Sequence, residues 1–461
     1  MITLTAKTIA KMTQGRLRAA EGIGVSKISI DSRQDNTGSL FVAIPGERFD
    51  GHDYVQQAVN NGATLVLAQE GKNIPDNIPA VFVPDTVKAL GLLASAYRDL
   101  FKIPVVAVTG SVGKTSTKEM IASILSAKFR VHKTKGNFNN EIGLPLSVLE
   151  LEDHHEAAVF ELGMRGFGEI SELSRIVKPD IAVITNIGIT HIERLGTRQN
   201  ILKAKLEILD GMDKDGTVVL NGDDELLSGL KGLLPHKTVF YGINEGNDIL
   251  AYDLCRKGEA GVSFKVQSPQ EDTEYFVPAP GIHNVHNALA GLAVARILGM
   301  TESEIKEGMA AYTGERLRLS IEEKDGIKFI NDSYNAAPSS MKAALDVLND
   351  IGKGKRKWAV LGDMLELGDY SEDAHREIGR LVSTLGIDYL VGIGKDARYY
   401  VKGTEENQDN RTTAILFDSI SDARNYIQTL MQKDDVLLFK GSRMMKLDVL
   451  VQELIGKEWN K

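Results

Sequence analysis

Short apolar runs rich in β-branched residues recur through the first part of the chain, separated by turns that contain Gly, Asp or Pro. Runs of this length and composition are typical of β-strands. They are KISI (27–30), LFVAI (40–44), TLVLA (64–68) and AVFVP (80–84). Between the second and third runs, VQQAVNNGA (55–63) has a helical pattern and ends at a glycine stop. The pattern predicts a small α/β domain.

A second pattern begins at IPVVAVTG (103–110), a fully apolar run that leads directly into a glycine turn. The next segment, KTSTKEMIASILSAKF (114–129), carries an apolar stripe at helical spacing from Met120 to Leu125. Strands and helices then alternate, which predicts a mostly parallel sheet. The strand-sized runs are AAVFELG (157–163), DIAVITNIG (180–188) and GTVVLNG (216–222), and a helix is predicted over VHNALAGLAVARILG (285–299).

The third part of the chain repeats this arrangement, with strand-sized runs that each end in a polar or glycine-rich loop. They are KFIND (328–332), KWAVLGDM (357–364), DYLVGIG (388–394) and DVLLFKGS (435–442). In open α/β sheets, the loops at the carboxyl ends of the strands hold ligands. We therefore predict an α/β protein with a small N-terminal α/β domain, a central phosphate-loop domain with a mostly parallel sheet, and a Rossmann-like C-terminal domain. The predicted domains are 1–84, 85–315 and 316–461.

Composition and charge narrow the possible partners. The chain has 461 residues, of which 43% are hydrophobic and 25% charged, and its formal net charge is -9. Lys and Arg are dispersed along the chain, which argues against nucleic acid as the main partner. The single cysteine, Cys255, excludes an internal disulfide and a Cys-rich zinc site. With no secretory signal and only strand-sized apolar runs, we expect a cytoplasmic protein without a membrane span, and nothing indicates more than a monomer.

The strongest local signal is VAVTGSVGKTSTKEM (106–120), a strand, a glycine turn and a helix that opens with Lys-Thr. In such a turn, backbone N–H groups surround phosphates, Lys114 reaches the β- and γ-phosphates, and the Thr115 hydroxyl can bind Mg²⁺. The strict phosphate-loop pattern would place glycine where Val108 stands. The alternative is an ordinary strand–turn–helix with a solvated lysine. ATP is favoured over GTP, because the chain has no N-K-x-D guanine signature.

Phosphoryl transfer needs cations, so metal ligands are expected at strand ends beside this loop. Glu161 ends one predicted strand and His191 follows another. A glutamate oxygen suits Mg²⁺, whereas a histidine in isolation is more often a polar loop residue. The helical segment ILKAKLEIL (201–209) contains Lys203 and Lys205, and spacing alone predicts that both are surface lysines.

Six motifs in sequence order resemble those of the Mur ligase family of peptidoglycan synthesis, and the resemblance covers essentially the whole chain. They are TGSVGKTST (109–117), ELGM (161–164), TNIGITHIERLG (185–196), AKLEI (204–208), GIHNVHNALA (281–290) and NDSYNAAPSS (331–340). Within the family, the chain is similar to the member that joins D-alanyl-D-alanine to UDP-N-acetylmuramoyl-tripeptide. The segments that carry this closer likeness are DSR (31–33), PGERFDGHDY (45–54), KGNFNNEIGLP (135–145), the tyrosine of DSYNAAP (332–338) and LGDMLELG (361–368).

The resemblance implies roles for residues on the ATP side of the site. It assigns the ATP phosphates to Gly110, Ser111, Val112, Gly113, Lys114, Thr115 and Ser116. It implies that Glu161 and His191 are magnesium ligands. It also implies that Lys205 is carbamylated and binds a second Mg²⁺. For His191 and Lys205 these roles differ from what the residues alone predict. It places Asn287 at adenine, and Arg316 and Asp332 near the phosphates and ribose. Because GERLRLS (314–320) has two arginines where the family has a Gly-Arg pair, the choice of Arg316 over Arg318 rests on the alignment of this motif.

The resemblance also implies where the other substrates bind. It assigns the uridine diphosphate to Asp31, Ser32 and Arg33 of the first domain, and the rest of the nucleotide-peptide to Asn137, Asn139 and Asn140. It assigns the incoming dipeptide to Tyr334, Asn335 and Pro338 of the third domain, which is expected to close on ATP. The implied chemistry begins when the tripeptide carboxylate attacks the γ-phosphate. The dipeptide amine then attacks the resulting acyl phosphate.

Other functions share parts of this pattern. A sister Mur ligase adding a single amino acid is the nearest alternative. A folylpolyglutamate synthetase has the same ATP chemistry, but its phosphate loop lies near the N-terminus, whereas here about a hundred residues precede the loop. A phosphate-loop kinase for small molecules would not need the third domain. A non-enzymatic nucleotide-gated binding protein would leave Glu161, His191 and Lys205 unexplained.

Overall fold

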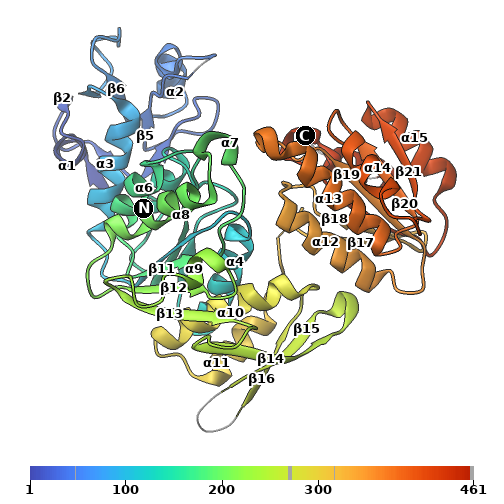
Figure 1. The fold of residues 1–461 in the computed structure, drawn as a ribbon. Coiled ribbons are helices and arrows are strands. Elements are labelled where there is room, and N and C mark those ends of the chain that lie inside the picture. The colour runs from blue at the N-terminus through green and yellow to red at the C-terminus, as the bar shows by residue number, and fades with distance from the viewer. Residues whose placement is uncertain (47, 268–271, 316, 457–461) are drawn as a thin grey trace. The chain divides into compact units, whose positions relative to one another are not determined.

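Sheets of mostly parallel strands form the framework of the protein in a computed structural model (Figure 1). The structure describes residues 1–46, 48–267, 272–315 and 317–456. Their contacts divide the chain into two compact units. The first comprises 1–109, 129–182 and 206–217, and the second comprises 110–128, 183–205 and 218–461.

The N-terminal part contains a five-stranded sheet with the order β2-β7-β6-β5-β4. All neighbouring pairs are parallel except β2 with β7. Its strands are β2 (Arg16–Arg18), β4 (Lys27–Ser29), β5 (Ser39–Val42), β6 (Leu65–Gln69) and β7 (Ala80–Val83). The short strands β1 (Leu4–Thr5) and β3 (Gly24–Val25) pair separately, and the helices are α1 (Ala6–Met12), η1 (Gly51–Tyr54) and α2 (Val55–Asn60). The four runs predicted from the sequence are the four parallel strands of this sheet.

A nine-stranded sheet follows, with the order β16-β15-β14-β13-β12-β11-β8-β10-β9. Its strands are β8 (Val105–Thr109), β9 (Val131–Lys133), β10 (Ala157–Glu161), β11 (Ile181–Ile184), β12 (Thr217–Asn221), β13 (Lys237–Gly242), β14 (Ile249–Arg256), β15 (Val262–Val266) and β16 (Thr273–Val277). The helices of this region are α3 (Thr86–Arg98), α4 (Lys114–Leu125), α5 (Gly143–Val148), α6 (Glu169–Val177), α7 (Ile192–Leu195), α8 (Arg198–Leu206), η2 (Glu207–Gly211), α9 (Glu225–Ser228), η3 (Gly258–Ala260), α10 (Ile282–Ile297) and α11 (Glu302–Ala310). The antiparallel pairs β14–β15 and β15–β16 were not predicted from the sequence.

Helix α4 is shorter than its sequence predicts. The predicted helix ran from 114 to 129, but α4 ends at Leu125. Beyond this residue the backbone N–H groups of Ala127 and Lys128 donate to carbonyls three residues earlier, which tightens the last turn. The Lys128 ammonium then donates to the carbonyl of Gly299, at 2.8 Å. A similar change ends α8 at Leu206, where the predicted helix continues as η2.

The C-terminal sheet has six strands in the order β17-β18-β22-β19-β20-β21, and only β17 runs antiparallel to its neighbour. The strands are β17 (Ser320–Lys324), β18 (Ile327–Asn331), β19 (Lys357–Gly362), β20 (Tyr389–Ile393), β21 (Thr413–Phe417) and β22 (Val436–Lys440). The helices are α12 (Pro338–Ile351), η4 (Gly368–Tyr370), α13 (Ser371–Thr384), α14 (Arg398–Glu405), α15 (Ile420–Leu430), η5 (Arg443–Met445) and α16 (Leu447–Ile455). This doubly covered, mostly parallel sheet is the Rossmann-like arrangement that the sequence predicts.

Successive residues of the C-terminal strands enter two separate cores. Along β22, Leu438 belongs to the core under α12 and α13, whereas Leu437 and Phe439 belong to the core under α15 and α16. Trp358 of β19 lies in the second core, is fully buried, and stacks on Tyr389 with ring centroids 3.9 Å apart. Alternation of this kind follows from the two-residue period of a strand covered on both faces.

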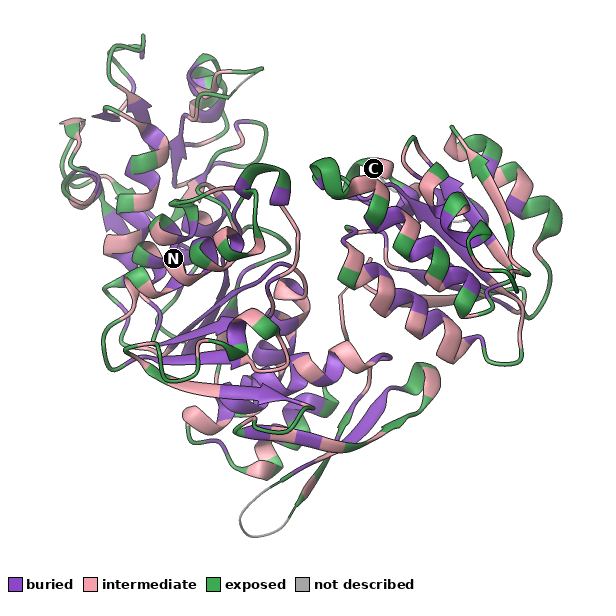
Figure 2. Ribbon diagram, viewed as in Figure 1, coloured by how far each residue is buried: buried purple, intermediate pink, exposed green. Residues whose placement is uncertain are grey.

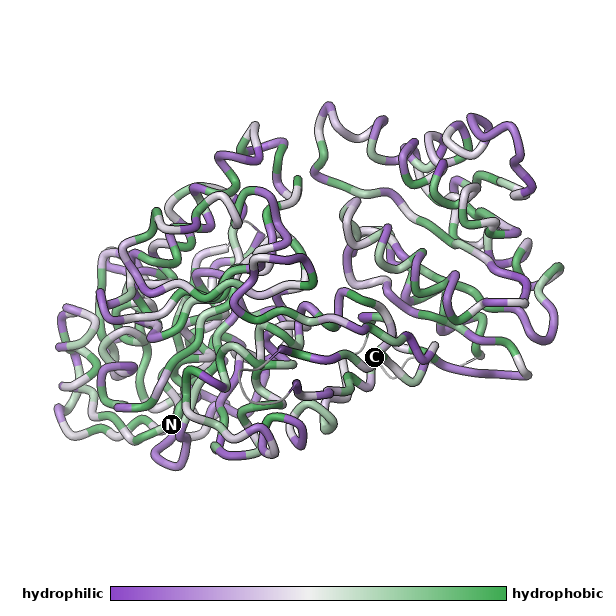
Figure 3. Tube along the Cα trace, turned by 60° about the horizontal axis from the view of Figure 1, so that its bottom comes forward, coloured by the Kyte–Doolittle hydropathy of each residue, from purple (hydrophilic) through white to green (hydrophobic). Residues whose placement is uncertain are grey.

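Buried positions concentrate on the strands of the large sheets (Figure 2). Hydrophobic stretches follow the same segments, and polar residues prevail in the loops (Figure 3). The α/β class predicted from the sequence is therefore confirmed. Among the described residues, no helix combines the length and the apolar content needed to cross a membrane.

Candidate active site

The glycine turn after β8 has a backbone that other residues could not adopt without strain. Gly110 has φ 155°, and a Cβ atom there would lie 1.9 Å from Thr185 Oγ1. Gly113 has φ 80° and is the N-cap residue of α4, and as a glycine it brings no capping side chain. The backbone N–H groups and the positive end of the helix dipole at such a helix start suit a phosphate.

The segment after β11 supports this turn from one side. The Ser111 N–H donates to the Asn186 carbonyl at 3.0 Å, and the Val112 N–H donates to Asn186 Oδ1 at 3.0 Å. The Gly188 N–H donates to Ser111 Oγ at 2.9 Å. The predicted histidine ligand, His191, lies three residues after Gly188 in the same segment.

Lys114 and Thr115 begin α4 directly after the turn. Lys114 Nζ donates to the Gly110 carbonyl at 2.9 Å, and Arg318 Nη2 donates to Thr115 Oγ1 at 2.8 Å. The Arg318 guanidinium also lies over the Tyr334 ring, 4.2 Å from its centroid. Arg316, which the family resemblance favoured, lies outside the described residues. Arg318 therefore contacts the first turn of α4, the helix that follows the glycine turn.

Glu161 is a buried carboxylate at the end of β10, which pairs in parallel with β8. Its Oε1 accepts a hydrogen bond from Asn139 Nδ2 at 2.7 Å, and its backbone N–H donates to Thr134 Oγ1. Its Oε2 is buried and has no hydrogen-bond partner among the described residues. A buried carboxylate oxygen without a partner is costly unless a cation approaches it.

His191 has a left-handed backbone, with φ 63°, and precedes α7. Its Nδ1 lies 2.6 Å from Glu366 Oε2, although the geometry is not that of a hydrogen bond. Burial lowers the pKa of His191, and the Glu366 charge opposes this effect. The structure therefore places a carboxylate of the segment LGDMLELG beside the predicted histidine ligand.

The prediction that both lysines of α8 lie on the surface is wrong for Lys205 and right for Lys203. Lys203 is exposed, but Lys205 is 2% exposed because it lies one helical turn after Ile201, on the buried face of α8. In the described part of the chain, the Lys205 side chain has no hydrogen bond or ion pair. Burial lowers the pKa of Lys205 well below its usual value, and the charge of Lys114 lowers it further.

Asn287, predicted to meet adenine, lies where α10 packs against α4. Its Oδ1 accepts a hydrogen bond from Thr117 Oγ1 at 2.8 Å, and its Nδ2 donates to Asn284 Oδ1 at 3.0 Å. A Cβ atom on Gly113 would lie 3.6 Å from Asn287 Oδ1. Asn287 is therefore next to the phosphate turn. Ser116, in the first turn of α4, lies close to Tyr312, whose pKa is raised mainly by burial.

The predicted dipeptide residues lie on the loop between β18 and α12. Asp332 begins this loop, and its Oδ2 lies 2.5 Å from Lys440 Nζ at the end of β22. Lys440 also donates to the Asn335 carbonyl at 3.0 Å, and Pro338 opens α12. Sequence reasoning missed Lys440. The available signal was the lysine at the carboxyl end of the apolar run DVLLFKGS (435–442).

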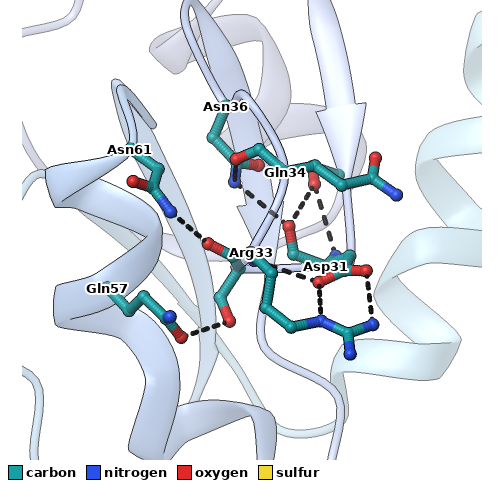
Figure 4. Close-up of polar contacts among 8 residues, drawn as sticks. Asp31, Arg33, Gln34, Asn36, Gln57 and Asn61 are labelled. Carbon is teal, nitrogen blue, oxygen red and sulfur yellow. Dashed lines mark hydrogen bonds and ion pairs between the residues drawn. The ribbon is translucent and has the colours of Figure 1, made fainter.

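The predicted uridine diphosphate residues form a hydrogen-bonded loop after β4 (Figure 4). Arg33 pairs with Asp31 through two side-chain contacts, of 2.9 and 2.8 Å, which lower the pKa of Asp31 to about 2. Ser32 Oγ donates to Gln57 Oε1 at 2.8 Å, and Asn61 Nδ2 donates to the Ser32 carbonyl. The loop is thus attached to α2, and the Arg33 side chain remains largely exposed.

The three predicted asparagines lie between β9 and α5 and have different surroundings. Asn139 contacts Glu161, as described above, and its carbonyl accepts from the Gly163 N–H. Asn140 Oδ1 accepts from the Gly143 N–H at the start of α5. Asn137 is exposed. Of the three, Asn139 is the one in direct contact with a predicted metal ligand.

Comparison with known protein families shows which family the chain belongs to. The Mur ligase middle domain matches residues 108–295, the Mur ligase glutamate ligase domain matches 316–443, and the Mur ligase catalytic domain matches 24–124. The chain belongs to the Mur ligase family. The middle-domain match includes the phosphate turn, Glu161, His191 and Lys205, whose geometry is described above.

Full-length relatives and solved structures of Mur ligases are similar to the chain. The UDP-N-acetylmuramoyl-tripeptide–D-alanyl-D-alanine ligase of Bacillus subtilis (strain 168) is 40% identical over 460 residues, which cover 99% of both chains. The crystal structure of MurF from Acinetobacter baumannii has a TM-score of 0.90 and 35% identity, and covers 99% of both chains. The structure of MurF ligase from Thermotoga maritima in complex with ADP has a TM-score of 0.82 and 31% identity, covering 93% of this chain and 96% of that one. The three-domain Mur ligase fold predicted from the sequence is therefore confirmed.

Proposed function

We propose that the protein is an ATP-dependent ligase that joins D-alanyl-D-alanine to UDP-N-acetylmuramoyl-tripeptide, in the cytoplasmic synthesis of peptidoglycan precursors. The observation that carries this proposal is the full-length similarity to ligases of that name, at 40% identity for the Bacillus subtilis enzyme. The geometry adds a phosphate turn that only glycine can form at Gly110, followed by Lys114 and Thr115. ATP use is supported by the ADP bound to the Thermotoga maritima relative.

We further propose three regions with separate tasks. Residues 1–84 bind the uridine nucleotide through the Asp31–Arg33 loop, and residues 85–315 bind ATP. Residues 316–461 bind the dipeptide and contribute to the ATP site. The ordered Asp31–Arg33 loop supports the first assignment, because it presents an exposed guanidinium that can pair with a diphosphate. Asn137, Asn139 and Asn140 are assigned to the nucleotide-peptide, and Asn287 to adenine.

The residues present fit Mg²⁺. The described residues contain no group of three or more His, Cys, Asp or Glu side chains that could hold a metal ion alone. Mg²⁺ in nucleotide sites does not need one, because it binds one or two carboxylates together with phosphates and water. The buried, unpartnered Oε2 of Glu161 is a ligand of the required kind. Thr115, Glu161, His191 and a carbamylated Lys205 would hold the metal, which would neutralise charge on the transferred phosphoryl group.

In the first step, the tripeptide carboxylate attacks the γ-phosphate of ATP and ADP leaves. Lys114 moves from the Gly110 carbonyl to the phosphates, where its charge stabilises the transition state. The N–H groups at the start of α4 hold the phosphates in place. Arg318 already donates to Thr115 and is placed to add a second positive charge.

In the second step, the amine of D-alanyl-D-alanine attacks the acyl phosphate, and phosphate leaves from a tetrahedral intermediate. The amine must be unprotonated to attack. The acyl phosphate must also be protected from water until the amine arrives. Tyr334, Asn335 and Pro338 are the residues assigned to the dipeptide, and Asp332 is assigned to the ribose of ATP.

Lys205 is proposed to react with CO₂ to form a carbamate. The reaction requires a neutral amine, and burial lowers the pKa of Lys205 in the direction that provides one. The product carries a negative charge where an ammonium would repel a metal cation. Absence of a counter-charge on Lys205 among the described residues is consistent with this modification.

The test is phosphate release from ATP with defined pairs of acid and amine. UDP-N-acetylmuramoyl-tripeptide with D-alanyl-D-alanine is expected to give rapid phosphate release and a joined product identified by mass spectrometry. Single amino acids, and folate with glutamate, serve as the matched alternatives for a sister Mur ligase and a folylpolyglutamate synthetase. Equal or faster turnover with one of those pairs would reject the proposed substrate pair. Phosphate transfer to a small molecule without amide formation would indicate a kinase.

A further inference from the structure

Lys440 is a buried lysine whose ammonium group donates to three oxygens of one loop. It is the last residue of β22 and is 2% exposed. Its Nζ lies 2.5 Å from Asp332 Oδ2, 3.0 Å from the Asn335 carbonyl and 3.5 Å from the Asp332 carbonyl. An ammonium has three hydrogens to donate, and three oxygens of this loop receive them.

The three oxygens belong to the two ends of one short loop. Asp332 follows β18 directly, and Asn335 lies three residues later, before α12 begins at Pro338. Inside the loop, Ser333 is held separately, because its N–H and hydroxyl both donate to Asn331 Oδ1. Lys440 therefore holds the two ends of the loop at a fixed distance from each other.

The same loop presents Tyr334 to the Arg318 guanidinium, which donates to Thr115 at the phosphate helix. Asp332 is also fixed on its other oxygen, which accepts from the Leu319 N–H at 3.2 Å. One buried cation thus supports the Asp332 carboxylate, which the proposed function assigns to the ribose of ATP, and the Asn335 carbonyl, which belongs to a residue it assigns to the dipeptide. Burial of a charge without such partners would be strongly unfavourable.

We propose that Lys440 is a positioning residue that couples the ATP-facing and dipeptide-facing ends of the loop Asp332–Asn335. This inference rests on the proposed function, which supplies the two substrates. The proposal gives Lys440 no direct contact with either substrate. Its removal should disturb both binding sites together, because it holds both ends of the loop, and should leave the uridine nucleotide site unchanged.

The test is the Lys440→Met variant, which keeps the length of the side chain and removes the charge. Lys357→Met is the matched control, because Lys357 begins β19, the strand beside β22. There it donates to Asn349 Oδ1 and the Leu385 carbonyl, at the opposite end of the same strand pair. The KM values for ATP, dipeptide and nucleotide-tripeptide are measured for both variants, together with ATP-analogue affinity by calorimetry and thermal unfolding by circular dichroism.

Lys440→Met should raise the KM values for ATP and dipeptide by about tenfold each and leave the KM for the nucleotide-tripeptide within about twofold. Lys357→Met should change none of the three by more than about twofold. If Lys440→Met does not fold, Lys440→Gln retains an uncharged NH2 donor group and should give a smaller rise in the same two constants. Unchanged constants, an equal rise in all three, or a rise in one substrate only would overturn the proposal. Failure of the proposed function is recognised separately, on the wild-type chain, because it would then release no phosphate with the dipeptide.

Discussion

Lys205 and Lys440 are both 2% exposed, but the groups around them differ completely. Lys440, at the end of β22, has three oxygen acceptors within 3.5 Å, and one belongs to a carboxylate. Lys205, on α8, has no hydrogen bond or ion pair in the described ranges, and its pKa is lowered by burial and further by the positive charge of Lys114. Both lysines lie in regions that the sequence assigns to substrate chemistry.

The difference matches the two roles proposed above, a lysine that positions its surroundings and a lysine that reacts with CO₂. A buried ammonium with full hydrogen bonding holds other groups in place. A buried ammonium without partners is disfavoured, so the neutral amine is the favoured form. Buried groups of the second kind concentrate at functional sites. Burial alone therefore says little about the role of a lysine, and its partners decide it.

The largest effect is expected from Lys114→Ala, which removes the positive charge at the phosphate turn. Phosphoryl transfer should fall by on the order of a thousandfold or more, because Lys114 stabilises charge in the transition state. The pKa of Lys205 should rise in this variant, since the like charge that lowers it is gone. Lys128→Ala, on the exposed turn after α4, is the control. Ligase activity of Lys114→Ala within tenfold of wild type would contradict the assignment.

Lys205→Ala should lower the ligation rate by about a hundredfold, because the variant cannot form the proposed metal-ligating carbamate. Added acetate should restore part of the activity by supplying a carboxylate in the vacated space. Acetate should not rescue Lys440→Met, which lacks a cation rather than an anion. Lys203→Ala, the exposed neighbour on α8, should behave as wild type. The carbamate role is wrong if Lys205→Ala keeps near wild-type activity.

Replacement of each lysine by methionine should change stability in opposite directions. Lys440→Met leaves the Asp332 carboxylate without its cation and should lower the free energy of unfolding by on the order of 3 kcal/mol. Lys205→Met removes a buried amine that has no partner among the described residues, and should raise the free energy of unfolding by on the order of 1 kcal/mol. Chemical denaturation in buffer free of carbon dioxide measures both. A loss of stability in both variants would show that the two environments do not differ in the proposed way.

The smallest effect is the pH dependence of the Lys205→Met stability difference. The pKa of Lys205 is lowered well below 10.5 in the folded chain and is near that value when the chain is unfolded. Between these two pKa values the unfolded chain holds one more proton, so wild-type stability rises with pH. The advantage of Lys205→Met should therefore shrink as the pH approaches about 10.5. A constant advantage from neutral to alkaline pH, measured by thermal unfolding, would argue against a depressed pKa.

Most of the strands were predictable, because a parallel strand that is buried on both faces has a continuous run of apolar residues in the sequence. The runs at 40–44, 64–68 and 357–364 each contain most of a strand of the structure. The antiparallel strands β15 and β16 were missed, since polar residues such as Lys265 and Glu274 interrupt their apolar pattern. Helix ends were also misplaced, because local backbone hydrogen bonds near Lys128 decide where α4 stops.

Site residues that are neighbours in the sequence were predictable, whereas residues that only packing brings to the site were harder to predict. The phosphate turn could be read from Gly110 and Lys114, because turn and helix start are neighbours in the chain. The burial of Lys205 could not be read from spacing, since it depends on which face of α8 meets the rest of the protein. Lys440 lies more than a hundred residues after Asp332, and only the pairing of β18 with β22 brings them together.

Trp358 gives the C-terminal sheet its own optical signal. The chain has two tryptophans, Trp358 and Trp459, and the first lies in a core, stacked on Tyr389 and donating its indole N–H to Asp435. A Trp459→Phe chain would carry a single tryptophan, on the strand next to β22. Its fluorescence would then follow the melting of this sheet alone, while circular dichroism follows the whole chain. Separate melting curves from the two signals would reveal a C-terminal region that unfolds as an independent unit.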